Sequence, residues 1–188
     1  VQNLINIKEE IKSNFANKKN YKIPKIIAVS KTFGMDKILP LIEYGHSDFG
    51  ENKVQEAIEK WTEIKLSNDN IKLHLIGGLQ TNKVKLAVKL FDYIHSVDSE
   101  RLAKKISDEQ LKQNKKVRIF IQVNIGNEEQ KNGVQISELE SFYNTCVNKL
   151  DLNIIGLMCL PPEKQDAKPF FKKMRDLKKS LSLNELSM

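Results

Sequence analysis

Two kinds of hydrophobic pattern alternate along the chain. Segments with apolar residues at every third or fourth position predict amphipathic helices, and short runs of consecutive apolar residues predict buried strands. We expect helices at about residues 1–17, 35–44, 54–64, 81–90, 98–113, 137–149 and 169–181. We expect strands at about 26–32, 47–49, 71–76, 92–96, 117–125 and 154–160, with the start of a seventh at 184–188.

Strand and helix alternate at a spacing of about 25 residues, which is typical of right-handed βαβ units and a parallel sheet. The predicted fold class is α/β, a (β/α)8 TIM-type barrel that is truncated before its last strand. An open doubly wound sheet is the competing architecture. It usually has a glycine-rich turn after its first strand, whereas the turn from Lys31 to Gly34 contains a single glycine.

Lys31 is the first candidate for chemistry, because it follows the apolar run that predicts the first strand. We expect this strand to be buried on both faces and to end at Lys31, where parallel α/β folds bind their ligands. Burial or a nearby cation lowers the pKa of a lysine, and the neutral amine can form a Schiff base with an aldehyde. The alternative is an ordinary lysine whose amine extends into water.

Other polar residues are predicted at the ends of the following strands. Asn52 is a ligand candidate or a helix cap, and His74 is a site residue or a histidine whose hydrogen bonds are satisfied inside the fold. Ser96 ends the fourth predicted strand, Asn124 lies in the fifth and Met158 lies in the sixth. No Ser-His-Asp or Cys-His arrangement and no cluster of metal ligands is apparent, which disfavours hydrolases and metalloenzymes.

Composition supports one globular domain. The chain has 188 residues, 40% of them hydrophobic, and no run approaches the roughly 20 apolar residues that span a bilayer. Its two cysteines show no metal or disulfide spacing, so we expect a cytoplasmic protein. The net charge of +7 permits nucleic-acid binding, but the lysines alternate with acidic residues along predicted helices and aromatics are few. We therefore expect neither a nucleic-acid nor a membrane partner.

Seven motifs, taken together and in order, resemble the pyridoxal-phosphate homeostasis proteins (the YggS/PROSC family). They are AVSKT at 28–32, FGENKVQE at 49–56, HLIGGLQTNK at 74–83, HSVD at 95–98, QVNI at 122–125, EQKNGV at 129–134 and GLM at 156–158. The resemblance extends from about residue 1 to Met188. Two departures are Gly78, where proline is usual, and Phe33, where lysine is common.

The resemblance implies a single barrel domain over 1–188, similar to the N-terminal domain of alanine racemase. It implies pyridoxal 5'-phosphate (PLP) held as a Schiff base on Lys31, with Asn52 near the cofactor ring. The pocket would be lined by His74, Ser96, Asn124 and Met158. In the family, the segment that binds the phosphate lies beyond the position of Met188, so we expect it to be absent from this sequence.

The function implied is that of a monomeric carrier or buffer, which binds PLP reversibly and influences vitamin B6 and amino-acid balance. PLP-dependent apoenzymes are its expected partners. A racemase needs a second base from a further domain, so we expect no turnover by the chain itself. The alternatives are a PLP-dependent enzyme with weak or narrow racemase-type activity, and a basic interaction module without a cofactor.

Overall fold

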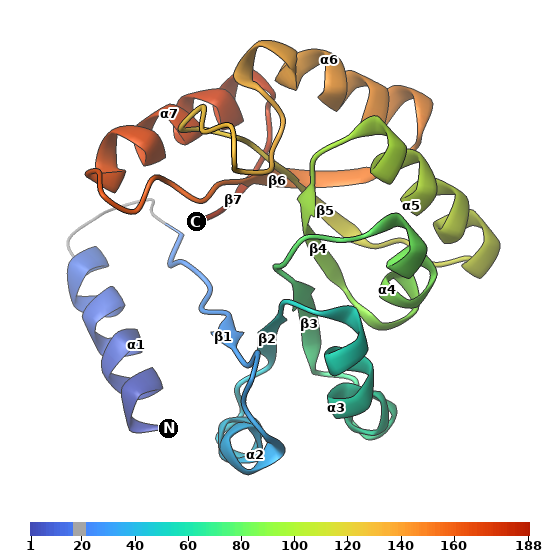
Figure 1. Ribbon diagram of the computed structural model, residues 1–188. Helices are drawn as coiled ribbons and strands as arrows, with labels where there is room; N and C mark the ends of the chain where they lie inside the picture. The colour runs from blue at the N-terminus through green and yellow to red at the C-terminus, as the bar shows by residue number, and fades with distance from the viewer. Residues whose placement is uncertain (17–21) are drawn as a thin grey trace.

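The computed structural model describes residues 1–16 and 22–188 and shows a curled parallel sheet with helices outside it (Figure 1). The strands are β1 (Ala28–Val29), β2 (Asp48–Glu51), β3 (Lys72–Leu75), β4 (Tyr93–Val97), β5 (Arg118–Gln122), β6 (Asn153–Met158) and β7 (Glu185–Ser187). The main helices are α1 (Gln2–Phe15), α2 (Met35–Glu43), α3 (Val54–Ser67), α4 (Val84–Leu90), α5 (Glu100–Gln113), α6 (Leu139–Asn144) and α7 (Ala167–Ser180). Short turns of other helix types are η1 (Thr81–Lys83), η2 (Ile136–Glu138) and η3 (Thr145–Lys149).

The order of the strands in the sheet is their order in the sequence, β1 to β7, and every neighbouring pair is parallel. Each crossover carries a helix on the outer face, as βαβ units require. The predicted barrel-type fold class is therefore confirmed. Residues 1–16 and 22–188 form seven strands and no eighth, as predicted.

The hydrophobic core lies between the sheet and the helices. Strand residues that alternate along the chain point to opposite faces, so Phe49, Leu73 and Ile94 pack outward while their neighbours point into the barrel. Trp61 of α3 is fully buried and its ring lies 4.8 Å from that of Phe49. This layer fixes the strands, and through them the loops at their carboxyl ends.

The prediction of a long first strand buried on both faces is wrong. The strand β1 comprises only Ala28 and Val29, and the side chain of Val29 is 46% exposed. Among the described residues, β1 pairs with β2 alone and forms an edge of the sheet. A run of apolar residues cannot distinguish an edge strand from a central one, because both satisfy the same local pattern. The predicted end of the first helix, at about residue 17, lies outside the described residues.

Charge is less evenly spread than the alternation of lysine and acidic residues indicated. The helix α7 carries six basic residues and one acidic residue, a net charge of +5 out of +7 for the chain. Its apolar side packs on the sheet through the buried Met174. Within residues 1–16 and 22–188, no helix is both long enough and apolar enough to cross a membrane.

Candidate functional site

The carboxyl ends of the strands bring most of the predicted site residues to one end of the sheet. Lys31 is exposed just after β1, and Asn52 is half-buried just after β2. Ser96 is buried in β4, Asn124 is buried two residues beyond β5, and Met158 is buried at the end of β6. Lys31 therefore follows the strand rather than ending it, and its amine reaches solvent at the mouth of the barrel.

The turn that carries Lys31 is held from below by two side chains of α3. The Lys60 amine donates to the carbonyl oxygens of Ser30 at 2.8 Å and Phe33 at 3.3 Å, on both sides of Lys31. The Glu56 carboxylate accepts a hydrogen bond of 2.8 Å from the backbone N–H of Thr32. Thr32 has a φ of +66°, which is unusual for a β-branched residue, so the turn depends on these bonds.

A fully buried carboxylate, Glu51, lies beneath this turn. Its Oε1 accepts from the Ser30 hydroxyl at 2.7 Å and the Trp61 indole at 3.0 Å, and it forms an ion pair of 2.8 Å with Lys60. Burial by itself lowers the pKa of Lys60, but its bonds to Glu51 and Glu56 outweigh burial and raise that pKa. Lys60 therefore stays charged while its amine organises the turn.

Asn52 and Ser96 meet at the backbone of Gly77. The Ser96 hydroxyl donates to the Gly77 carbonyl at 2.7 Å. A Cβ on Gly77 would lie 2.3 Å from the Asn52 carbonyl oxygen, so only glycine permits this approach. The structure thus joins the loops after β2 and β3 and the end of β4 into one rim.

Asn124 orders the loop after β5. Its side-chain amide donates to the Glu128 carbonyl at 2.9 Å, and its Oδ1 accepts from the Glu128 backbone N–H at 3.1 Å. Gln122, two residues earlier, donates to the Asn132 carbonyl at 3.1 Å and pairs in register with Met158. These amides therefore serve the protein's own backbone and shape the loop beside the mouth.

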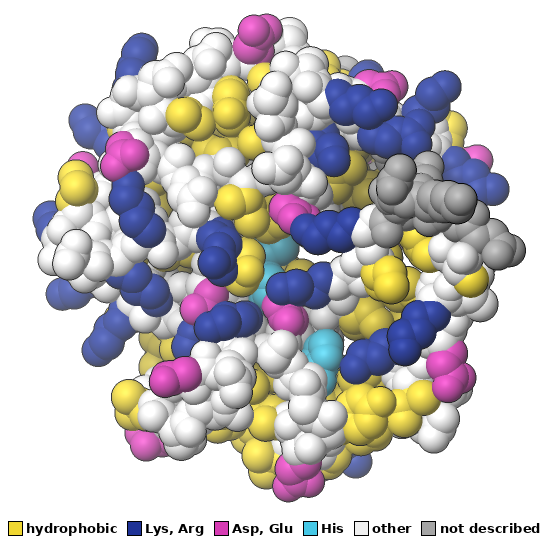
Figure 2. Space-filling view, turned by 180° about the vertical axis from the view of Figure 1, so that it is seen from behind, with side chains coloured by type: hydrophobic (Ala, Val, Ile, Leu, Met, Phe, Trp, Pro, Cys, Tyr) yellow, Lys and Arg dark blue, Asp and Glu magenta, His cyan; other side chains and the backbone are white. Residues whose placement is uncertain are grey.

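His74 lies deeper than the other candidates, inside the barrel. Its Nε2 is 3.1 Å from the Asp48 carboxylate, and its Nδ1 is 2.9 Å from Nε2 of His95. Nδ1 of His95 is 2.8 Å from the Ser187 hydroxyl of β7. Figure 2 shows histidine side chains at the floor of a hollow in the centre of one face, with charged side chains around it. We call Asp48, His74, His95 and Ser187 the interior chain.

Burial controls the protonation of the interior chain. It lowers the pKa of His74 despite the opposing bond to Asp48, and it lowers the pKa of His95 to about 3. Burial would raise the pKa of Asp48, but hydrogen bonds from His74, Ser47 and Lys25 hold it well below its usual range. Both imidazoles are thus neutral: Nε2–H of His74 donates to Asp48, Nε2–H of His95 donates to His74, and the Ser187 hydroxyl donates to His95.

The sequence did not predict the residues that support the Lys31 turn, Glu56 and Lys60. It also did not predict the partners of His74 in the interior chain, which are Asp48, His95 and Ser187. Glu56 and Lys60 are four residues apart, the spacing of an ion pair on a helix, and this pair was available as a signal. His74 and His95 contact each other through strand register, which the sequence does not display. Among the described residues, no group of three or more His, Cys, Asp or Glu side chains is placed to hold a metal ion.

The family model of the alanine racemase N-terminal domain matches residues 7–185 of the chain. Alanine racemase from Corynebacterium glutamicum shares the fold, with a TM-score of 0.64 at 18% identity over 85% of this chain and 46% of that one. More similar is PipY of Synechococcus elongatus, solved without PLP and with PLP bound. The form without PLP gives a TM-score of 0.81 at 31% identity and covers 95% of this chain and 88% of PipY.

Curated relatives narrow the assignment. A pyridoxal phosphate homeostasis protein of Aquifex aeolicus is 34% identical over 84% of this chain and 69% of its own length. One of Buchnera aphidicola is 38% identical over 78% of this chain and 65% of its own length. The chain belongs to the pyridoxal phosphate homeostasis protein family. It spans about two thirds of the length of these relatives.

Proposed function

We propose that the chain binds PLP through the amine of Lys31 and acts as a reversible PLP carrier in vitamin B6 homeostasis. The observation that carries the proposal is the exposed Lys31 on a turn that Glu56 and Lys60 hold in one conformation. The relative PipY, which has been solved with PLP bound, and the family membership support it. The carrier role, the partner apoenzymes, the cytoplasmic location and the monomeric state belong to this proposal.

The residues at the mouth fit the aldehyde and ring of PLP. Lys31 supplies the accessible amine, and the half-buried Asn52 supplies an amide at the neighbouring strand end. Below them the barrel is closely packed over Gly50, because a Cβ there would lie 3.1 Å from both Ile27 and Ile76. Condensation of the PLP aldehyde with an amine forms a Schiff base and releases water, a step that is reversible.

The other residues of the rim act on position rather than on chemistry. The Ser96 hydroxyl bonds to the Gly77 carbonyl, and the Asn124 amide bonds to the loop after β5. Met158 contributes an apolar surface at the end of β6, and His74 supports the floor through the interior chain. His74, Ser96 and Asn124 make their side-chain hydrogen bonds within the protein, which supports a carrier without turnover of its own.

Absorption spectroscopy of the purified protein with added PLP tests the assignment of Lys31. We expect a visible band that borohydride removes, followed by recovery of the label on the peptide that contains Lys31. Lys31→Ala should lose the band. Lys104→Ala, which removes an exposed lysine from α5, should retain it. Equal labelling of Lys31 and other exposed lysines would contradict the assignment of Lys31 as the PLP-binding residue.

Transfer experiments separate the carrier from an enzyme. The protein loaded with PLP should activate a PLP-dependent apoenzyme at a rate set by release of the cofactor. It should leave L- and D-amino acids unchanged on a chiral column. Racemisation by the parent protein that disappears in Lys31→Ala would show that the protein is an enzyme, and would overturn the carrier proposal.

A further inference from the structure

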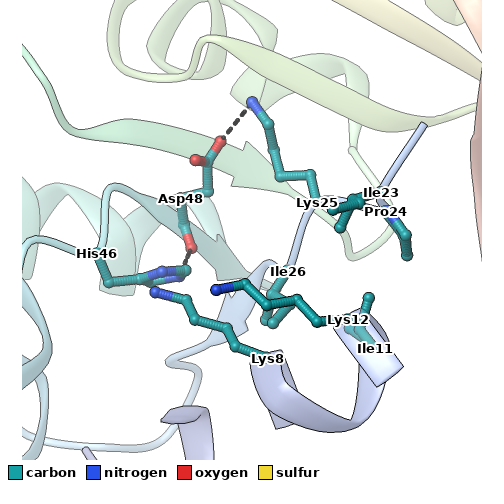
Figure 3. Close-up of a pocket in the computed structure, with 9 residues that line it drawn as sticks. All are labelled: Lys8, Ile11, Lys12, Ile23, Pro24, Lys25, Ile26, His46 and Asp48. Carbon is teal, nitrogen blue, oxygen red and sulfur yellow. Dashed lines mark hydrogen bonds and ion pairs between the residues drawn. The ribbon is translucent and has the colours of Figure 1, made fainter. Parts of the chain in front are cut away.

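A cavity lies at the opposite end of the barrel from Lys31. It is formed by α1, by the segment before β1 and by the start of β2, and its volume is about 270 Å³ (Figure 3). Its apolar walls are Ile11, Ile23, Pro24 and Ile26. This volume is just below the roughly 300–1,000 Å³ of most small-molecule sites, so the cavity suits a ligand with one ring or a short chain.

Two lysine amines approach this cavity from α1. Lys8 and Lys12 are four residues apart and therefore lie on one face of the helix. Figure 3 shows both side chains extending toward the ring of His46. Within the described residues neither lysine forms an ion pair with a carboxylate, although the Lys8 amine lies 4.9 Å from the centre of the Tyr44 ring. Two cations are therefore available to a ligand.

The remaining polar groups of the cavity are already committed to one another. Lys25 donates to the Asp48 carboxylate at 3.2 Å, and Nε2–H of the buried His46 donates to the Asp48 carbonyl oxygen at 2.8 Å. Lys8, Lys12 and Lys25 carry three positive charges, and Asp48 carries one negative charge, which leaves an excess of two. Positive charge at one side of an apolar cavity selects an anion that has an apolar body.

We propose that this cavity binds a small amphipathic anion, a phosphate monoester or carboxylate whose apolar part lies against Ile11, Ile23 and Ile26. Lys8 and Lys12 bind the anionic group, and the His46 ring lies beside it. The proposal is independent of PLP binding at Lys31, because the two sites lie at opposite ends of the strands.

The test uses the three histidines of the chain as reporters, with phenyl phosphate as the probe. Imidazole resonances are followed by NMR during titration. We expect a saturable shift of His46, with His95 as an internal reference. Inorganic phosphate should bind about tenfold more weakly, because it buries no ring against the apolar wall.

The double variant Lys8→Gln, Lys12→Gln should weaken phenyl phosphate binding by about tenfold. The matched control is Lys168→Gln, Lys172→Gln, which removes two exposed lysines at the same spacing from α7 and should leave the affinity unchanged. Lys31→Ala should also bind normally, which separates this site from the PLP proposal. No saturable shift of His46, or equal weakening by both double variants, would overturn the inference.

Discussion

Lys60 connects the candidate site with the helix that packs beside it. Only 12% of its side chain is exposed, and its amine pairs with Glu51 and Glu56 while it bonds to the backbone on both sides of Lys31. Oε2 of Glu51 is buried and has no hydrogen-bond partner among the residues that the structure describes. The carboxylate therefore depends on its other oxygen, and on Lys60 for charge compensation.

Lys60→Met should lower the free energy of unfolding by about 3 kcal/mol, because it leaves the Glu51 charge buried without a cation. Urea denaturation measures this loss, with Lys104→Met as the control. Glu51→Gln added to Lys60→Met should recover part of the stability, since it removes the uncompensated charge. A loss no larger than that of Lys104→Met would contradict the role assigned to Lys60.

At the scale of elements, the rim is built where the loops after β2 and β3 touch. Gly77 allows this contact because its missing Cβ would collide with the Asn52 backbone, at 2.3 Å from the carbonyl oxygen and 2.8 Å from Cα. The adjacent Gly78 is different, since a Cβ there would meet only the Asn132 side chain at 3.8 Å. The fold therefore requires glycine at position 77, whereas position 78 has room for a Cβ.

Gly77→Ala should lower the free energy of unfolding by about 2 kcal/mol and weaken PLP binding, because the loop that carries Asn52 must move. Gly78→Ala provides the matched control and should change stability by less than about 0.5 kcal/mol. Urea denaturation and PLP titration of both variants test the difference. Equal effects of the two substitutions would show that the contact with Asn52 does not restrain the loop.

Across the whole molecule, the sequence predicted the order of elements well and the interior poorly. Helix and strand periods are local, so the alternation, the seventh strand and Lys31 beside the mouth followed from the pattern. The exposure of β1 could not be predicted from the pattern, because the position of a strand at the edge of a sheet depends on which strands pair. The contact between His74 and His95 also requires register between β3 and β4, and the His95–Ser187 bond joins residues 92 positions apart.

The buried histidines predict that stability falls as the solution becomes acidic. The folded pKa of His95 is about 3, below the ordinary value near 6.5, so between these values only the unfolded chain binds the proton. The contribution of the neutral His95 ring to the free energy of unfolding is complete above pH 6.5 and is lost as the pH decreases. From pH 7 to pH 5 it amounts to about 2 kcal/mol, and the lowered pKa values of His46 and His74 act in the same direction.

Urea denaturation at several pH values measures this dependence. His95→Gln retains a donor and an acceptor but cannot be protonated, so it should reduce the slope of stability against pH by about one proton near pH 5 and by about half a proton at pH 6.5. Glu→Gln substitutions on the exposed surface should leave the slope unchanged. An unaltered slope in His95→Gln would contradict the neutral, buried state of this ring.

The hydrogen bonds of the interior chain all run in one direction, from the Ser187 hydroxyl to the Asp48 carboxylate. Reversing any one of them would place two donors or two acceptors face to face at the next. The ionised Asp48 carboxylate can only accept, so it fixes the tautomers of His74 and His95 together, and strands β2, β3, β4 and β7 share one ordered chain of hydrogen bonds. Displacement of β7 at one edge of the sheet would consequently leave Nδ1 of His95 buried without its donor, while Asp48 would still fix the tautomers of both rings.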